Sequence, residues 1–168
     1  MMRITQATER DFPYVRSLFL EYIEWLIPIV ETVWEYHIDI TPAEAIEHSM
    51  ADIQKFMPPD GRLFLAGDES DVIGCACSWT LRPGLAEIKR VYVRPSGRGN
   101  GTGRALIQTL IADLRDAGYT TVRLDTGTFM TAAEKLYRSL GFQDIAPYDE
   151  SETPKDFRQH AIFLELSL

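Results

Sequence analysis

The residues best placed to do chemistry lie in one glycine-rich segment, from Arg98 to Arg104. Its glycines, Gly99, Gly101 and Gly103, stand at alternate positions. Glycine lets the backbone turn so that its N–H groups converge, and a helix that follows adds unpaired amides and the positive end of its dipole. Such a segment binds anions, and a pyrophosphate is the ligand that its length suits.

Two common phosphate-binding patterns were tested against this segment. A P-loop needs a Gly-Lys pair, which the chain does not contain. A dinucleotide fingerprint needs glycine or alanine at its last position, where this chain offers Thr102, Arg104 or Leu106 instead. Asp125 lies roughly 20 residues further on, where a ribose-binding carboxylate belongs in that scheme. A nicotinamide-binding oxidoreductase therefore stays as a third interpretation.

The elements before the segment argue against a doubly wound nucleotide fold. Short apolar runs separated by turn residues predict strands at 62–66, 72–81 and 85–93, with turns at 67–71 and at Pro83-Gly84. Three consecutive antiparallel strands thus precede the glycines, whereas a doubly wound fold alternates strands with helices from the start. A helix predicted from Gly101 to Ala117 follows them.

The flanking segments predict a mixed fold. Apolar residues at helical spacing predict a helix from Asp11, which can cap it, to Ile27. Thr41 and Pro42 begin a second helix that continues to about Phe56. The other predicted elements are strands at 3–7, 120–125, 142–146 and 160–166, a helix at 131–140 ended by a left-handed Gly141, and a polar loop at 148–158.

Two motifs together resemble one known family. Residues Arg98-Gly99-Asn100-Gly101-Thr102-Gly103 match Arg/Gln-x-x-Gly-x-Gly/Ala after a Val-x-Val-x-Pro strand, and 133–142 match Ala-x-x-Leu-Tyr-x-x-x-Gly-Phe. The chain resembles the GCN5-related N-acetyltransferases (GNAT) over residues 85 to 145. This resemblance implies an α/β (α+β) fold, with a mostly antiparallel central sheet of about six to seven strands and about four helices.

The resemblance also implies acetyl-coenzyme A as co-substrate and no metal. Its pantetheine arm would pair with the strand before the glycines, and its pyrophosphate would lie on the loop. Many relatives carry an asparagine where this chain has Met130, while Ala133 leaves room for the arm. The implied cofactor-binding residues are Val91, Tyr92, Val93, Arg98, Gly99, Asn100, Gly101, Thr102, Gly103, Arg104, Met130 and Ala133. Arg94 also lies near enough to favour an anionic ligand.

Acyl transfer to an amine needs a base, an acid and an oxyanion donor. The resemblance assigns the donor to a backbone amide of residues 91–93, and the acid to Tyr137, whose phenol keeps its proton at neutral pH. It assigns the base to Glu87. The alternative for Glu87 is a structural pairing with Lys89, its neighbour on the same face of the strand; Lys89 and Arg90 are interpreted as pairing or surface charges.

The acceptor is expected to be a primary amine of a small molecule or peptide, attacking directly in a ternary complex. Tyr22, Trp25 and Asp125 are the candidate acceptor-binding residues, because aromatic and acidic groups suit a cation. The alternative is that such aromatics belong to the core. A non-catalytic acyl-CoA-binding or sensing protein is the alternative function.

Composition sets the remaining expectations. The 168 residues suit one domain, 1–168, and the net charge, 17 minus 25 or −8, argues against a nucleic-acid partner. No apolar stretch approaches the roughly 18 residues of a membrane span. Cys75 and Cys77 would share one strand face as reduced core thiols, and the three histidines lack metal-ligand spacing. We expect a cytoplasmic enzyme that binds neither a membrane nor a metal, and a homodimer is compatible with the sequence.

Overall fold

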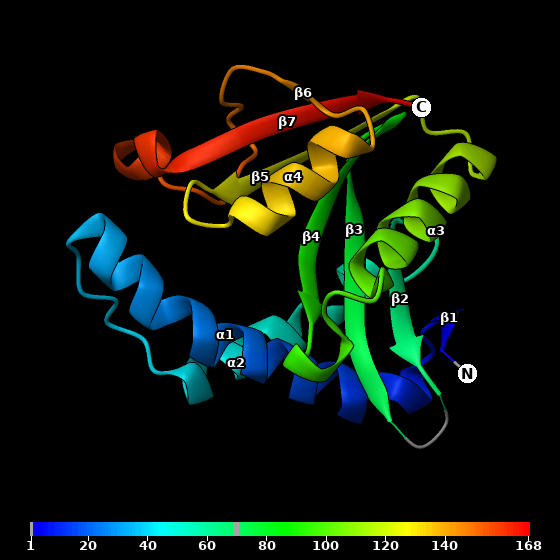
Figure 1. Ribbon diagram of the computed structural model, residues 1–168, viewed down its shortest axis with the longest axis horizontal. Coiled ribbons are helices and arrows are strands. Elements are labelled where there is room, and N and C mark those ends of the chain that lie inside the picture. Colours follow the sequence, from blue (N-terminus) through cyan, green and yellow to red (C-terminus); the bar gives the residue numbers. More distant parts are fainter. Residues whose placement is uncertain (1, 69–70) are drawn as a thin grey trace.

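A computed structural model describes residues 2–68 and 71–168. Within them, seven strands form one open sheet in the order β1-β2-β3-β4-β5-β7-β6 (Figure 1). All neighbouring strands are antiparallel except β4 and β5. The predicted mixed, mostly antiparallel sheet is therefore confirmed. The strands are β1 (Arg3–Gln6), β2 (Gly61–Gly67), β3 (Val72–Arg82), β4 (Leu85–Val93), β5 (Thr121–Gly127), β6 (Gln143–Asp144) and β7 (Ala161–Ser167).

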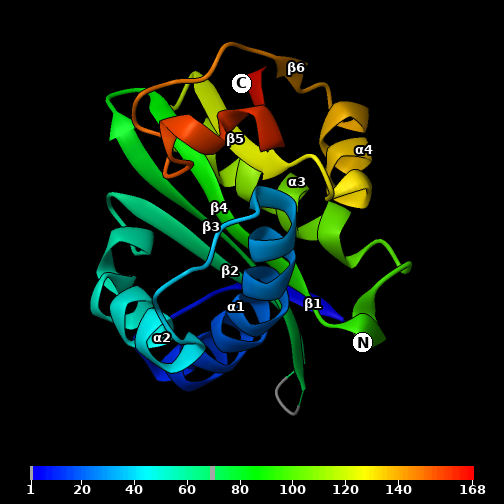
Figure 2. The same ribbon diagram turned by 90° about the vertical axis from the view of Figure 1, so that its left-hand side faces the viewer.

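Helices cover both faces of this sheet (Figures 1 and 2). One apolar core lies between the sheet and α1 and α2, and a second lies between the sheet and α3 and α4. The α-helices are α1 (Phe12–Trp34), α2 (Pro42–Ala51), α3 (Thr102–Asp116) and α4 (Thr131–Ser139), and short 3-10 turns are η1 (Glu9–Asp11), η2 (Ile53–Phe56), η3 (Pro95–Gly97) and η4 (Lys155–His160).

The alternation of side chains along the strands separates these two cores. In β2, Leu63 and Leu65 face α1 while Phe64 faces α3, and all three are buried. Burial of each such side chain stabilises the fold by about 1.5–3 kcal/mol. Cys75 and Cys77 lie in the α1 core as free, buried cysteines, so their predicted place in the core is confirmed.

The sheet opens between β4 and β5. These strands pair only where 85–87 meet 121–123, and they then diverge, as Figure 1 shows. Further along β4, the register with β3 shifts, and Arg90 has a φ of 52° in the left-handed region. From Ile88 to Val93, therefore, the β5 side of β4 has no strand partner among the described residues.

In the first third, two predicted helix ends and one predicted side-chain cap were wrong. Helix α1 continues through Pro28 to Trp34, because Val30 is buried and its packing outweighs the hydrogen bond that proline removes. The Asp11 carboxylate does not cap α1; it accepts hydrogen bonds from the Thr8 N–H and hydroxyl, at 2.7 and 2.9 Å. Thr41 does cap α2, but this helix ends at Ala51.

The other predicted elements lie near their expected positions in the chain, but several differ in length. Strand β6 has only two residues, and η4 occupies the end of the predicted polar loop. The turn predicted at 67–71 includes residues 69 and 70, which lie outside the described residues. None of the described helices is long and apolar enough to cross a membrane.

Candidate active site

The glycine segment forms an open loop that leads into α3. Gly99 and Gly101 have φ values of 77° and 81°, a region that favours glycine, and none of the described atoms lies within 4 Å of a Cβ built at either position. Gly101 is the N-cap of α3, so no side chain satisfies the amides of the first turn. These amides and the helix dipole are therefore available to an anionic ligand.

A groove of about 540 Å³ runs from this loop along β4 to the start of α4. Its floor includes the β4 residues whose β5 side lacks a strand partner. Its lining residues are Tyr22, Trp25, Val91, Tyr92, Val93, Gly97, Arg98, Gly99, Gly101, Thr102, Gly103, Arg104, Phe129, Met130, Thr131, Ala132, Ala133 and Leu136. Backbone thus dominates the loop end, whereas apolar side chains line the other end.

A second cavity, of about 270 Å³, lies where β4 and β5 diverge. We call it the inner cavity. It adjoins the groove, because Tyr22, Val91, Phe129, Met130, Ala133 and Leu136 line both. The remaining lining residues are Leu26, Val30, Trp34, Ile88, Lys89, Arg90, Leu124, Asp125, Thr126, Gly127, Tyr137, Glu152, Thr153, His160 and Ala161. A ligand in the groove can therefore meet a second ligand in the inner cavity.

An aromatic contact joins α1 to η4 beside the inner cavity. Trp34, the last residue of α1, stacks on Phe157 of η4, with ring centroids 4.4 Å apart. Figure 2 shows this end of α1 close to η4. The inner cavity thus depends on segments more than a hundred residues apart in the sequence.

Glu87 is fully buried and bonded to three donors. Its Oε2 accepts a hydrogen bond from Trp79 Nε1 at 2.7 Å, and its Oε1 accepts one from the Tyr148 hydroxyl at 2.7 Å. Lys89 Nζ lies 3.1 Å from the same Oε1. Burial raises the pKa of the Glu87 carboxyl, although Lys89, Tyr148 and Trp79 each act to lower it. Glu87 does not line the inner cavity.

Lys89 connects this buried carboxylate to the inner cavity. Its ammonium also lies 3.4 Å from Glu152 Oε2, and its side chain is only 8% exposed. Burial acts to lower the pKa of Lys89, but Asp125, Glu87 and Glu152 together outweigh burial and raise it. Lys89 is therefore a protonated, neutralised cation, so its interpretation as a pairing charge is confirmed and a surface position is wrong.

Two tyrosines, Tyr22 and Tyr137, line the inner cavity, and Tyr22 also lines the groove. Burial raises the pKa of Tyr22 to about 12 and raises the pKa of Tyr137 further, with Asp125 contributing to both shifts. Tyr137 is 5% exposed and packs against Phe142. Both phenols consequently keep their protons at neutral pH.

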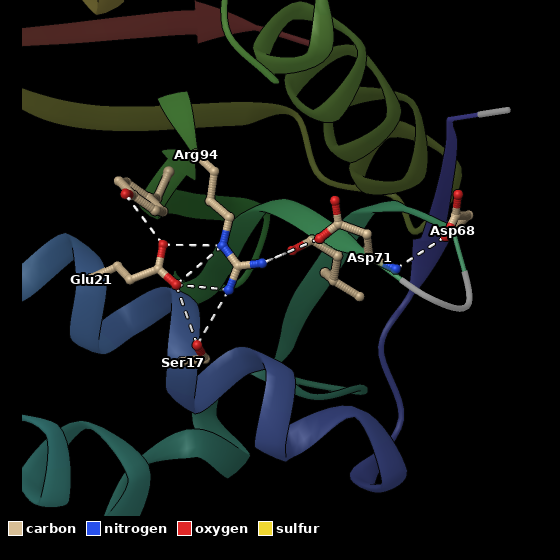
Figure 3. Close-up of polar contacts among 7 residues, drawn as sticks. Ser17, Glu21, Asp68, Asp71 and Arg94 are labelled. Carbon is tan, nitrogen blue, oxygen red and sulfur yellow. Dashed lines mark hydrogen bonds and ion pairs between the residues drawn. The ribbon is translucent and has the colours of Figure 1, made fainter. Parts of the chain in front are cut away.

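Arg94 is occupied by carboxylates and does not serve the loop, contrary to expectation. Its Nη2 lies 2.7 Å from Glu21 Oε1 and its Nη1 lies 3.4 Å from Asp71 Oδ1 (Figure 3). The hydrogen bond from Arg94 lowers the pKa of Glu21 despite partial burial. This contact fastens α1 to the end of β4. Arg98 donates to the Val93 carbonyl at 2.8 Å, and Arg104 donates to Ser139 Oγ at 2.7 Å.

Comparison with known proteins identifies the family. Residues 26–142, which are most of the chain, match the acetyltransferase (GNAT) family. The chain belongs to this family. It is 32% identical over 124 residues to the IAA acetyltransferase of Azospirillum brasilense, covering 73% of this chain and 80% of that protein. It is also 32% identical over 128 residues to an uncharacterized N-acetyltransferase of Schizosaccharomyces pombe, covering 75% and 78%.

Solved structures share the GNAT fold. The PaiA N-acetyltransferase of Thermoplasma acidophilum, solved in complex with coenzyme A, superposes with a TM-score of 0.76 at 14% identity, covering 100% of this chain and 99% of that one. A GCN5-related N-acetyltransferase of Kribbella flavida superposes with a TM-score of 0.71 at 23% identity, covering 99% and 98%. The GNAT family consists of acyltransferase enzymes, so this chain is an acyltransferase.

The structure brings the predicted GNAT cofactor residues together. All of them except Asn100 line the groove. Tyr22 and Asp125 line the inner cavity, whereas Trp25 lines the groove. Contact of these residues with coenzyme and acceptor stays a prediction.

Sequence reasoning missed most of the inner cavity. Arg90, Glu152 and the apolar residues Leu26 and Val30 all line it, and none of them was predicted to belong to the site. The sequence held one signal for these residues: apolar residues keep their helical spacing past Pro28. The bulge that turns Arg90 toward the inner cavity has no counterpart in the alternation of residues along β4. Among the described residues, no group of three or more histidine, cysteine, aspartate or glutamate residues could hold a metal.

Proposed function

We propose that this GNAT enzyme transfers an acetyl group from acetyl-CoA to a primary amine by direct attack in a ternary complex. The observation that carries this proposal is the meeting of the groove and the inner cavity beside the open edge of β4. The presence of coenzyme A in the PaiA relative's structure supports the choice of co-substrate.

The groove suits coenzyme A on its own geometry. The left-handed Gly99 and Gly101 leave space where side chains would otherwise lie, and the first amides of α3 face that space. Val91 and Val93 offer an unpaired strand edge to the amide groups of pantetheine. Met130 lines the groove without the polar side chain that many relatives have at this position, and Ala133 leaves room beside it.

The bound coenzyme supplies an acetyl thioester at the junction with the inner cavity. The amine nitrogen forms the new C–N bond as the C–S bond breaks, and one proton leaves the nitrogen while another reaches the sulfur. Tyr137 supplies the second proton, because its buried phenol is protonated and lines the inner cavity. A backbone amide of 91–93 stabilises the charge that develops on the carbonyl oxygen.

Two carboxylates are candidates for the base. Glu87 is the residue that the family resemblance predicts, and its raised pKa suits a base, but its carboxylate reaches the inner cavity only through Lys89. Asp125 lines the inner cavity directly. Its Oδ2 accepts hydrogen bonds from Ser151 and Thr153, and none of the described residues donates to its Oδ1. The proposal keeps Glu87 as base and names Asp125 as the alternative.

The experiment measures thiol release from acetyl-CoA with a panel of primary amines. Tyr137→Phe should lower kcat by about 100-fold or more without weakening coenzyme binding, because general acid catalysis contributes about 10²–10⁴-fold. Tyr14→Phe, at an exposed tyrosine, is the matched control. Since burial raises the pKa of Tyr137, kcat should show no decline from this group below about pH 10.

The same assay shows which carboxylate is the base, and it distinguishes an enzyme from a non-catalytic acyl-CoA-binding protein. Glu87→Gln should abolish the ascending limb of the pH profile if Glu87 is the base, and Asp125→Asn should do so if Asp125 is. Coenzyme binding without turnover of any amine would favour the non-catalytic acyl-CoA-binding protein and contradict the proposal.

A further inference from the structure

Arg90 lines the inner cavity and has no charged partner among the described residues. Its guanidinium lies 5.5 Å from the Phe19 ring centroid, and its Nε is buried without a hydrogen bond. Within residues 2–68 and 71–168 it forms neither an ion pair nor a side-chain hydrogen bond. A cation beside apolar groups is costly unless a ligand or solvent satisfies it.

The backbone around Arg90 is built to present this cation. The β3–β4 register shifts between Cys75 and Cys77, and Arg90 takes the left-handed φ of 52°. Non-glycine residues rarely take this conformation, which costs about 1–3 kcal/mol. As a result, Lys89 and Arg90, although adjacent in the chain, both line the inner cavity.

Lys89 cannot perform the same task as Arg90. Its ammonium lies within 3.4 Å of both Glu87 and Glu152 carboxylates, which neutralise it. Arg90 is therefore the cation of the inner cavity that is free to bind an anionic group, and its planar fork matches a carboxylate.

The other residues that line the inner cavity restrict the remaining parts of a ligand whose anionic group binds Arg90. Asp125 presents an Oδ1 that accepts no hydrogen bond from the described residues, which suits the amine. Leu26, Val30 and Trp34 provide an apolar wall on α1. The volume of about 270 Å³ is below the range of about 300–1,000 Å³ typical of drug-sized ligands, so the acceptor is compact.

We propose that the acceptor is a small amino acid-like amine that carries a carboxylate. Its carboxylate binds Arg90, its nitrogen lies at Asp125, and its apolar or aromatic body packs on Leu26, Val30 and Trp34. This inference rests on the proposed function and narrows its substrate class. It disfavours a polyamine acceptor, which would place positive charge against Arg90.

The experiment compares three amines that share one aromatic body: phenylalanine, its amide, and 2-phenylethylamine. Leucine, its amide and 3-methylbutylamine form a second, aliphatic set. The wild-type kcat/KM should be about 100-fold higher for the amino acid than for the other two members of its set. A charge-assisted hydrogen bond between Arg90 and the carboxylate can contribute up to about this factor. Arg90→Gln should remove this preference, and Arg90→Lys should restore part of it.

The controls separate binding from folding. Arg115→Gln removes the same charge from the exposed end of α3 and should leave the preference intact. Arg90→Gln should not lower the thermal midpoint or coenzyme affinity, because the Nε that it removes has no partner. A lower midpoint with an unchanged preference would show that Arg90 is structural and would overturn the inference.

The outcomes distinguish this inference from the proposed function. Acetylation of 2-phenylethylamine and 3-methylbutylamine at least as fast as of the two amino acids overturns the substrate class but leaves the N-acetyltransferase proposal standing. If no amine is acetylated, the proposed function fails. In that case, calorimetry with N-acetylphenylalanine and the coenzyme A complex decides the Arg90 site: binding that Arg90→Gln abolishes supports it, and no binding overturns it.

Discussion

The two halves of the candidate active site are built by different means. The coenzyme loop uses backbone from one continuous segment, 95–104, in which the left-handed Gly99 and Gly101 have open space among the described residues where a Cβ would lie. The inner cavity uses side chains from α1, β4, β5 and the 148–160 segment. A site made of local backbone can be recognised from a short motif, whereas a site made of distant side chains depends on the whole fold.

The halves also differ in what they contribute to stability. The inner cavity adjoins a buried set of charges, in which Glu87 accepts from Trp79 and Tyr148 and pairs with Lys89. The loop buries little and has amides that await a ligand. We therefore expect changes behind the inner cavity to act mainly on folding, and changes in the loop to act mainly on coenzyme binding.

Glu87→Ala should have the largest effect. The substitution leaves the Lys89 ammonium, 8% exposed, without its closest carboxylate and leaves two further donors without an acceptor. Removal of one partner of a buried ion pair costs about 3–5 kcal/mol. Urea unfolding should report this loss in the free energy of unfolding. Glu47→Ala, which breaks the exposed pair with Arg16, should change it by less than about 1 kcal/mol.

The pH dependence of stability provides a second measure of this buried set. Because the carboxylates raise the pKa of folded Lys89 above 10.5, its contribution is fully present below the unfolded pKa and is lost as the pH rises through the folded pKa. Wild-type stability should therefore decline above about pH 10.4 more steeply than that of Glu87→Ala. Equal slopes would show that Lys89 and Glu87 are not coupled.

Gly101→Val should have the next largest effect, and its effect on coenzyme binding should separate it from a matched substitution at Gly118. Gly101 and Gly118 both have left-handed φ values, of 81° and 87°, and both have open space where a Cβ would lie. Valine should cost about 1–2 kcal/mol of stability at either position. Only at Gly101 should coenzyme A affinity, measured by calorimetry, fall by about 100-fold, through loss of two hydrogen bonds of about 1.5 kcal/mol each. An equal loss in Gly118→Val would mean that the loop is not the phosphate site.

The same contrast explains which parts of the molecule the sequence could predict. The Gly99–Gly103 spacing, the strand before it and the Ala133 to Phe142 motif are local patterns, and they located the groove. The extent of α1 past Pro28 depends on burial of Val30, which no local pattern reports. The pairing of Glu87 with Tyr148 joins residues 61 positions apart, so the sequence offered Lys89 as its only visible partner.

The smallest predicted effect concerns the aromatic contact between α1 and η4 beside the inner cavity. Trp34 and Phe157 stack with an interplanar angle of 4°, and such a pair is worth about 0.5–1.5 kcal/mol beyond its burial. Phe157→Leu keeps an apolar side chain but loses the stack, so α1 and η4 should separate more readily. We expect the KM of the acceptor amine to rise by about 3- to 10-fold, with coenzyme A affinity unchanged.

Phe157→Tyr keeps the stacked ring and should restore the wild-type KM, which separates the stacking contact from any general effect of substitution in η4. If Phe157→Leu weakens coenzyme A binding as much as it raises the acceptor KM, then η4 influences the groove as well. The shared wall formed by Tyr22, Phe129 and Met130 would then transmit changes from one half to the other. Because those side chains line both spaces, this measurement is the most sensitive test of whether the two halves bind their ligands independently.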